Sequence, residues 1–154
     1  MNNLKKLLAV SLLAIMATSA FARGGFAIVI DPKSYAEAKA EVDAYAKAVT
    51  KYNQLEVKII QDRWGVPDSI RAALISLYSD KKFGLQGCVL MGDIPVVMVR
   101  DGQHMTSAFK MNQKTFPRNE SSVPSDRFYD DFGLQFKFLD KDSIQPYYYY
   151  SLKA

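Results

Sequence analysis

Three short apolar segments separated by two amphipathic ones dominate the chain between residues 26 and 91. Residues 26–30 form the β-branched run Phe-Ala-Ile-Val-Ile, which is typical of a strand covered on both faces. Residues 55–60, in which Glu56 and Lys58 alternate with apolar residues, and the apolar residues 88–91 are predicted to be strands as well. Because helix-length crossovers separate the three strands, they can pair in parallel within one sheet.

The two segments between these strands carry the periodicity of helices. Residues 34–52 place apolar side chains at steps of three and four, with charged residues mostly between them. Residues 67–82 are predicted to form a second helix, because Pro67 suits a first helical turn and Lys81-Lys82 suits a last one. The expected buried stripes are Tyr35, Ala38, Val42, Tyr45, Val49 and Tyr52 in the first helix, and Ile70, Ala73, Leu74, Leu77 and Tyr78 in the second.

This order predicts an α/β fold in which a parallel sheet is flanked by helices, as in the β-α-β-α-β core of flavodoxin-like and caspase-like layers. We expect right-handed crossovers and the strand order 2-1-3. A loop-rich β segment follows: a strand at residues 96–99, a long functional or mobile loop over 100–124, and strands at 136–139 and 147–152. The four tyrosines in the last of these favour an aromatic-rich strand over a ligand-stacking platform.

Residues 1–22 have the layout of a cleaved secretory signal peptide. Two lysines are followed by a twelve-residue apolar stretch and by the sequence Ser-Ala-Phe-Ala, which fits an A-x-A cleavage site. A membrane-spanning helix needs about 20 apolar residues, so the stretch is too short to span a bilayer. We therefore expect a bacterial protein that is secreted, periplasmic or on the cell surface, with no membrane span after signal removal and with one α/β domain over 23–154.

Charge and cysteine content argue against several classes of partner. The chain has 20 basic and 16 acidic residues, but two of the basic ones belong to the predicted signal peptide. No basic cluster is interleaved with aromatic residues, so nucleic-acid binding is not expected. One cysteine cannot form an internal disulfide, and one cysteine with one histidine is a poor zinc ligand set. We therefore predict no metal and no cofactor.

The candidate chemistry begins with Cys88 and His104, the single cysteine and the single histidine. A thiolate nucleophile needs an adjacent base, but Cys88 lies in an apolar strand, where a free cysteine behaves as a small core residue. No catalytic residue is therefore assigned. Asp126, Asp130 and Asp131 could hold calcium or orient an amine, although capping and turn chemistry account for them more simply.

Gly92 and Asp93 follow the third predicted strand directly. Open α/β sheets place their binding crevices at the carboxyl ends of the strands, and we expect this pair to end a central one. Plain turn chemistry is the alternative. The candidate binding residues are therefore Gly92, Asp93 and Asp126.

Two motifs in this order carry a resemblance to a known family. Residues 88–95 read Cys-Val-Leu-Met-Gly-Asp-Ile-Pro, and residues 123–131 read Val-Pro-Ser-Asp-Arg-Phe-Tyr-Asp-Asp. Together they resemble the N-terminal subdomain of gingipain-like cysteine peptidases, and Trp64 and the helix start at 67–71 are similar too. The resemblance spans residues 26–154 and implies a caspase-like fold of two α/β subdomains that hydrolyses peptide bonds.

The chain departs from that family at the catalytic dyad. In the family, the catalytic histidine follows glycine after an apolar strand and the catalytic cysteine comes later, both in the second subdomain. Here His104 follows Gln103, and Cys88 precedes it. The resemblance thus implies an inactive N-terminal part, truncated before the catalytic residues, that docks to a second subdomain. In the full-length form it implies a protein or peptide substrate. A non-catalytic exported binding or docking module is the alternative.

Overall fold

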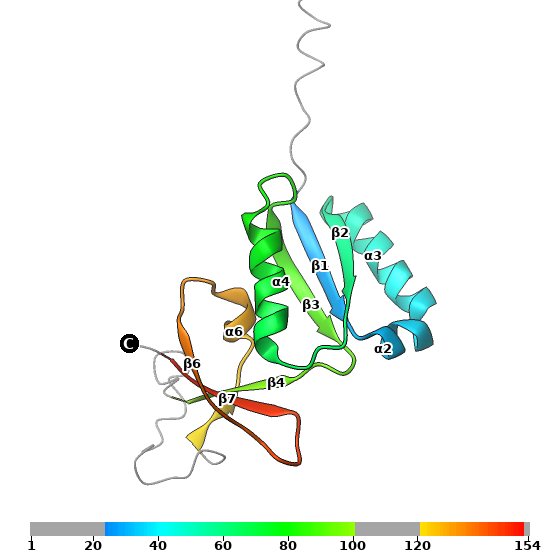
Figure 1. The fold of residues 1–154 in the computed structure, drawn as a ribbon. Coiled ribbons are helices and arrows are strands. Elements are labelled where there is room, and N and C mark those ends of the chain that lie inside the picture. Colours follow the sequence, from blue (N-terminus) through cyan, green and yellow to red (C-terminus); the bar gives the residue numbers. More distant parts are fainter. Residues whose placement is uncertain (1–23, 101–120, 153–154) are drawn as a thin grey trace, which may run out of the picture.

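The computed structural model describes residues 24–100 and 121–152, which form two β-sheets with helices packed on the first (Figure 1). The first sheet has three parallel strands in the order β2-β1-β3. Strand β1 (Gly25–Ile30) is central, between β2 (Glu56–Gln61) and β3 (Leu85–Met91). The predicted α/β class, parallel pairing and 2-1-3 order are confirmed.

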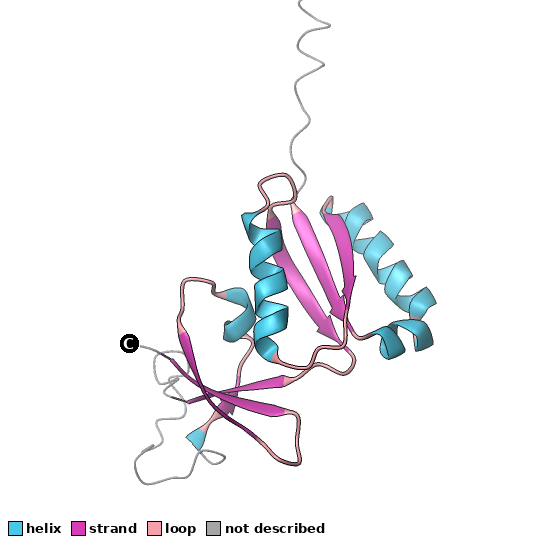
Figure 2. Cartoon of the chain, in the orientation of Figure 1, coloured by secondary structure: helices cyan, strands magenta, loops and turns pink. Residues whose placement is uncertain are grey.

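Helices cover both faces of this sheet (Figure 2). Helices α2 (Pro32–Glu37) and α3 (Lys39–Asn53) connect β1 to β2, and α4 (Pro67–Ser79) connects β2 to β3. Alternate residues of β1 point to opposite faces: Val29 packs with Ile70 of α4, whereas Ile28 packs with Val42 of α3. The continuous apolar sequence of β1 follows from this double coverage.

The first predicted helix differs from expectation in two ways. It is broken at Ala38, whose backbone (φ −121°, ψ 29°) leaves the helical region between α2 and α3. Its buried stripe is also narrower, since Val42 and Val49 are buried while Tyr45 and Tyr52 are 41% and 74% exposed. Only three strands lie beneath this face of the sheet, so there is too little apolar surface to cover the outer tyrosines.

Strand β3 also corrects the sequence prediction. It begins at Leu85 rather than Cys88, with a bulge against β1 between Gly25 and Phe26. It lies at an edge of the three-stranded sheet and not at its centre. The reason is that strand β4 (Val96–Arg100) does not continue this sheet, because the turn at Gly92 directs the chain into the second one.

The second sheet contains β4 together with β5 (Val123–Pro124), β6 (Phe136–Lys141) and β7 (Tyr147–Leu152). It is mixed, with the order β5-β4-β7-β6. Its strands β4 and β7 are parallel, whereas β5 and β6 pair antiparallel at the two edges. A short helix, α6 (Arg127–Asp130), lies between β5 and β6 in the sequence.

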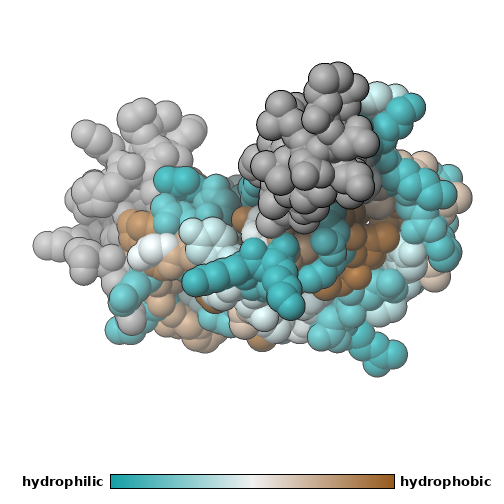
Figure 3. Space-filling view, turned by 90° about the horizontal axis from the view of Figure 1, so that it is seen from above, coloured by the Kyte–Doolittle hydropathy of each residue, from teal (hydrophilic) through white to brown (hydrophobic). Residues whose placement is uncertain are grey.

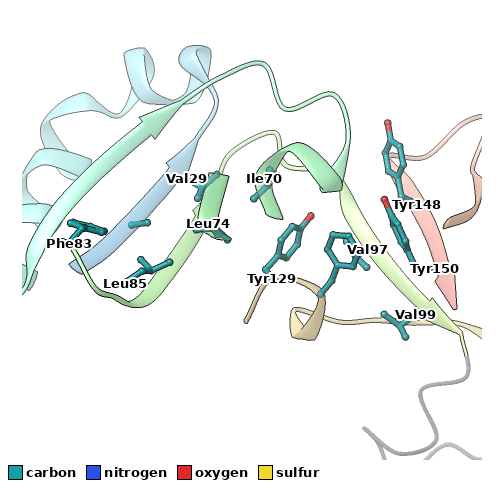
Figure 4. Close-up of a cluster of buried hydrophobic side chains, with 12 residues drawn as sticks. Val29, Ile70, Leu74, Phe83, Leu85, Val97, Val99, Tyr129, Tyr148 and Tyr150 are labelled. Atoms are coloured by element: carbon teal, nitrogen blue, oxygen red, sulfur yellow. The ribbon is translucent and has the colours of Figure 1, made fainter. Parts of the chain in front are cut away.

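One hydrophobic core joins the two sheets (Figure 4). It combines Val29 and Leu74 of the parallel half with Val97, Tyr148 and Tyr150 of the mixed sheet. Tyr148 and Tyr150 are only 5% and 1% exposed, so this strand is part of the core, as predicted, and not a stacking platform. The described residues therefore pack as one unit.

Arg71 of α4 connects the segment around α6 to the part of the chain that forms the parallel sheet. Its guanidinium donates hydrogen bonds to the carbonyl oxygens of Phe128, Asp131 and Leu134. It also lies over three aromatic rings, 5.2 Å, 5.7 Å and 5.3 Å from the centroids of Phe128, Phe132 and Phe136. A single side chain thus satisfies the backbone of an irregular segment that has few ladder hydrogen bonds.

Two earlier predictions concern other parts of the chain. The predicted signal peptide at 1–22 and residues 101–120 of the predicted loop lie outside the described residues. No helix within the described ranges is long and apolar enough to cross a membrane.

Seen from the end where the parallel strands begin, the surface mixes hydrophilic side chains with apolar ones (Figure 3).

Replacement of Arg71 tests this anchoring role. We expect Arg71→Met to lower the free energy of unfolding by about 2–3 kcal/mol, because three carbonyl groups lose a charged donor. Arg71→Lys should recover only part of the loss, since an ammonium group cannot reproduce the planar fork. Urea unfolding followed by circular dichroism measures the change.

The matched control is Arg127→Gln, which removes an exposed arginine from the same region. It should change the free energy of unfolding by less than about 0.5 kcal/mol. Equal losses for Arg71→Met and Arg127→Gln would contradict the anchoring role.

Candidate functional site

The carboxyl ends of the three parallel strands meet at a crevice of about 620 Å³. This is the position at which open α/β sheets bind ligands. The crevice is lined from three loops, which follow β1, β2 and β3 respectively. The lining residues are Asp31, Pro32, Lys33, Ser34, Glu37, Arg63, Trp64, Gly65 and Asp93.

Asp31 organises the crevice from the end of the central strand. One oxygen of its carboxylate accepts a hydrogen bond from the Ser34 N–H (3.0 Å), and the other accepts one from the Asp93 N–H (2.8 Å). The hydroxyl of Ser34 donates to the same carboxylate and, with these N–H groups, lowers the pKa of Asp31 to about 2. Asp31 is 7% exposed and stays ionised at neutral pH.

Gly92 makes this connection possible. Its backbone φ of +80° is in the left-handed region, which residues other than glycine adopt only at a cost in free energy. A Cβ atom here would lie 2.2 Å from an oxygen of Asp31 and 2.5 Å from the hydroxyl of Ser34. The Gly92-Asp93 step therefore has a demonstrable structural role: it brings the backbone N–H of Asp93 onto the Asp31 carboxylate.

The rest of the lining offers binding groups of both charges. Trp64 is held in place because its indole N–H donates to the carbonyl of Ile30 at 3.0 Å. Lys33 and Arg63 contribute positive charge, and Asp93 contributes an exposed negative one. An indole wall with charges of both signs suits a polar ligand such as a peptide, and no cysteine or histidine lines this crevice in the described part of the chain.

Asp126, the third predicted binding residue, lies in a different place. It lines a groove of about 590 Å³ beside β3, together with Cys88 and Tyr129. It also borders a recess of about 290 Å³ next to Ile94 and Pro95. Gly92 and Asp93 are therefore together at the strand ends, whereas Asp126 does not line their crevice.

The two motifs themselves are nevertheless in direct contact. The Tyr129 hydroxyl donates to the carbonyl of Pro95 at 3.2 Å, and the Ser125 N–H donates to the carbonyl of Val97 at 3.0 Å. Burial raises the pKa of Tyr129 well above the usual value, so its hydroxyl stays a neutral donor. The segment that follows the Gly-Asp turn is thus fixed against the segment that contains Asp126.

The neighbouring acidic residues have ordinary partners. Arg127 forms ion pairs with Asp130 and Asp131, each at 3.7 Å, and the Asp131 carboxylate accepts a hydrogen bond from the N–H of Gly133. Asp131 thus has a turn role, whereas the Asp126 side chain caps nothing. In residues 24–100 and 121–152, no group of three or more Asp, Glu, His or Cys side chains is placed to hold a metal ion.

Cys88 has the environment of a structural cysteine. Its thiol is partly buried within β3, and this burial, aided by the charges of Asp130 and Asp126, raises its pKa. A raised pKa suppresses the thiolate, which is the nucleophilic form. His104 lies outside the described residues.

The residue that sequence reasoning missed is Asp31. An aspartate that is followed directly by proline, with serine three positions after it, is a helix-start pattern and is the local signal that could have identified it. That pattern explains the bonds to Ser34, whereas the bond to Asp93 joins residues 62 positions apart and has no local signal.

Comparison with known proteins gives no relative. No family model, no curated protein and no solved structure matches this chain.

Substitution of Gly92 tests the turn. Gly92→Ala should lower the free energy of unfolding by about 2 kcal/mol, because the new methyl group meets the Asp31 carboxylate in a strained backbone conformation. Gly65→Ala is the matched control, since its Cβ would meet only one backbone atom, at 4.0 Å. Urea unfolding of both variants measures the difference, and equal stabilities would contradict the assigned role.

Acid titration tests Asp31. Its folded pKa of about 2 lies below the ordinary value of 3.8, so its stabilisation is complete above about pH 4 and is lost as the pH falls toward 2. Asp31→Asn should be less stable at pH 7 and should lose less stability between pH 4 and pH 2 than the parent. Urea unfolding across this range gives both curves, and parallel curves would argue against the network.

Proposed function

We propose that this chain supplies the supporting α/β subdomain of a gingipain-like cysteine peptidase and does not itself carry the catalytic dyad. The observation that carries the proposal is the contact between the two motifs of the resemblance. The Gly-Asp-Ile-Pro turn and the Ser-Asp segment are far apart in sequence, yet Tyr129 bonds to Pro95 and Ser125 bonds to Val97. Motifs that depend on each other structurally are expected to occur together in a family.

The chemistry of Cys88 supports the same assignment. Its thiol is partly buried and its pKa is raised, whereas a peptidase nucleophile needs a lowered pKa and an adjacent base. Catalysis in the complete enzyme would therefore use another cysteine and a histidine from a second subdomain. The substrate would be a protein or peptide, and the predicted signal peptide would direct the enzyme to the periplasm, cell surface or medium.

A non-catalytic exported binding module is the second candidate, and a different observation favours it. The crevice at the strand ends is open, is lined by Trp64 and by charges of both signs, and has a fixed framework in Asp31 and Gly92. Such a crevice could bind a peptide or a glycan without any covalent chemistry.

The coding sequence beyond Ala154, expressed as protein, distinguishes the two candidates. The peptidase proposal expects an apolar strand followed by Gly-His and then, after a further strand, a cysteine. The expressed protein should hydrolyse peptide substrates and lose activity when that later cysteine is replaced by alanine, while Cys88→Ala keeps it. A protein without such residues that binds peptides but does not cleave them would favour the binding module.

The chain itself allows a direct thiol test, because Cys88 is its only cysteine. At pH 8, we expect the native chain to react with a disulfide reagent about tenfold more slowly than a cysteine in an unstructured peptide, since the shielded thiol is mostly protonated. In urea the two rates should become equal. Rapid native reaction, or proteolysis by the 154-residue chain that Cys88→Ala abolishes, would contradict the proposal.

A further inference from the structure

The two edges of the three-stranded sheet differ in how they are protected. Strand β2 carries the charged residues Glu56 and Lys58, and charged side chains discourage further strand pairing. Strand β3 has the sequence Leu-Gln-Gly-Cys-Val-Leu-Met, with no charge and no proline over seven residues. Among the described residues it pairs with β1 alone. Its outer edge therefore offers unpaired backbone groups along an apolar strand.

A groove of about 590 Å³ follows this edge. Six consecutive residues of β3, from Leu85 to Leu90, line it. Successive side chains of a strand point to opposite faces, and Cys88 and Val89 indeed pack in different cores. Residues of both orientations thus line the groove, as expected for a groove that runs along the edge of the strand.

The far wall of the groove is aromatic and acidic. Tyr78 and Phe132 contact each other there, with ring centroids 5.1 Å apart, although Tyr78 remains 59% exposed. Asp126 and Asp130 contribute the only charged side chains among the described lining residues, and both are exposed. Asp130 is paired with Arg127, whereas the Asp126 carboxylate forms no hydrogen bond or ion pair with the described residues.

We propose that the outer edge of β3 is a strand-addition site for an extended, basic segment of a partner protein. The partner's backbone would pair with the free edge of β3, and its apolar side chains would fill the groove against Tyr78 and Phe132. A lysine or arginine of the same segment would lie beside Asp126 and Asp130. This inference stands on the β3 edge alone and does not depend on the peptidase proposal.

Charge decides between this partner and a second copy of the chain. Two copies paired through β3 would each bring Asp126 and Asp130 to the same junction, where like charges repel. A basic segment instead gains from the same carboxylates. The observed groove therefore favours a partner of opposite charge.

The probe is a fluorescent seven-residue peptide of alternating valine and lysine, with blocked ends, added to the full chain. We expect saturable binding by fluorescence anisotropy, weakened by added salt. Methylation of alternate backbone nitrogens on the pairing side should weaken binding at least about tenfold, because it removes hydrogen bonds along the ladder. A valine–glutamate peptide of the same length should bind more weakly than the lysine peptide.

Variants of the chain locate the site. Asp126→Asn should weaken binding of the lysine peptide about threefold and reduce its salt dependence. Glu56→Gln removes one exposed carboxylate from the edge of β2 and should leave the affinity unchanged. Bound peptide should also slow amide hydrogen exchange in β3 and alkylation of Cys88, which lines the groove.

Four outcomes would overturn the proposal. The first is no binding of the lysine peptide. The second is equal binding of the methylated peptide, which would leave only charge attraction. The third is a dimer in sedimentation equilibrium that Asp126→Asn strengthens, which would assign the edge to a second copy. The fourth is full protection of the β3 amides in the free chain, which would mean that another part of the same chain occupies it.

Discussion

The structure depends on the burial of the first strand between helices on its two faces. Ala27, Ile28 and Val29 have no exposed surface, and their side chains alternate between the α4 core and the α3 core. A strand buried this way must lie at the centre of its sheet, and β2 and β3 then take the two sides. Asp31 follows the carboxyl end of the same strand directly, so one buried element positions both the core and the crevice.

This dependence explains which features the sequence predicted well. The class and the parallel pairing follow from apolar runs and helical periodicity, which are local properties of the chain. The expected 2-1-3 order is also confirmed, but such local patterns do not determine it. Local patterns also do not predict that β4 belongs to a second sheet. Its sequence is as apolar as that of β3, and only pairing with Tyr147–Leu152, far along the chain, places it in a second sheet. Long-range pairing of this kind carries no local signal.

In the candidate site, too, the features with a local sequence signal could be predicted and those that depend on long-range contacts could not. Gly92 and Asp93 could be placed at a strand end from local turn chemistry, although that strand proved to be an edge strand. Arg71 could not be recognised, because its acceptors are backbone carbonyls of an irregular segment 57 to 63 residues away. Every residue has a backbone carbonyl, so the sequence does not indicate which carbonyls accept hydrogen bonds from an arginine. Such an arginine can be identified only from the folded structure.

The edge position of β3 connects these observations. Because β4 leaves the first sheet after the Gly92 turn, the side of β3 away from β1 has no strand beside it in the described chain. Arg71 meanwhile holds α6 and the residues after it near that side, which brings Asp126 and Phe132 to face the open edge. The turn that organises the crevice and the arginine that joins the two halves together therefore create the acidic groove. A protein that needed β3 only for stability would gain by covering this edge with charge, as it does on β2.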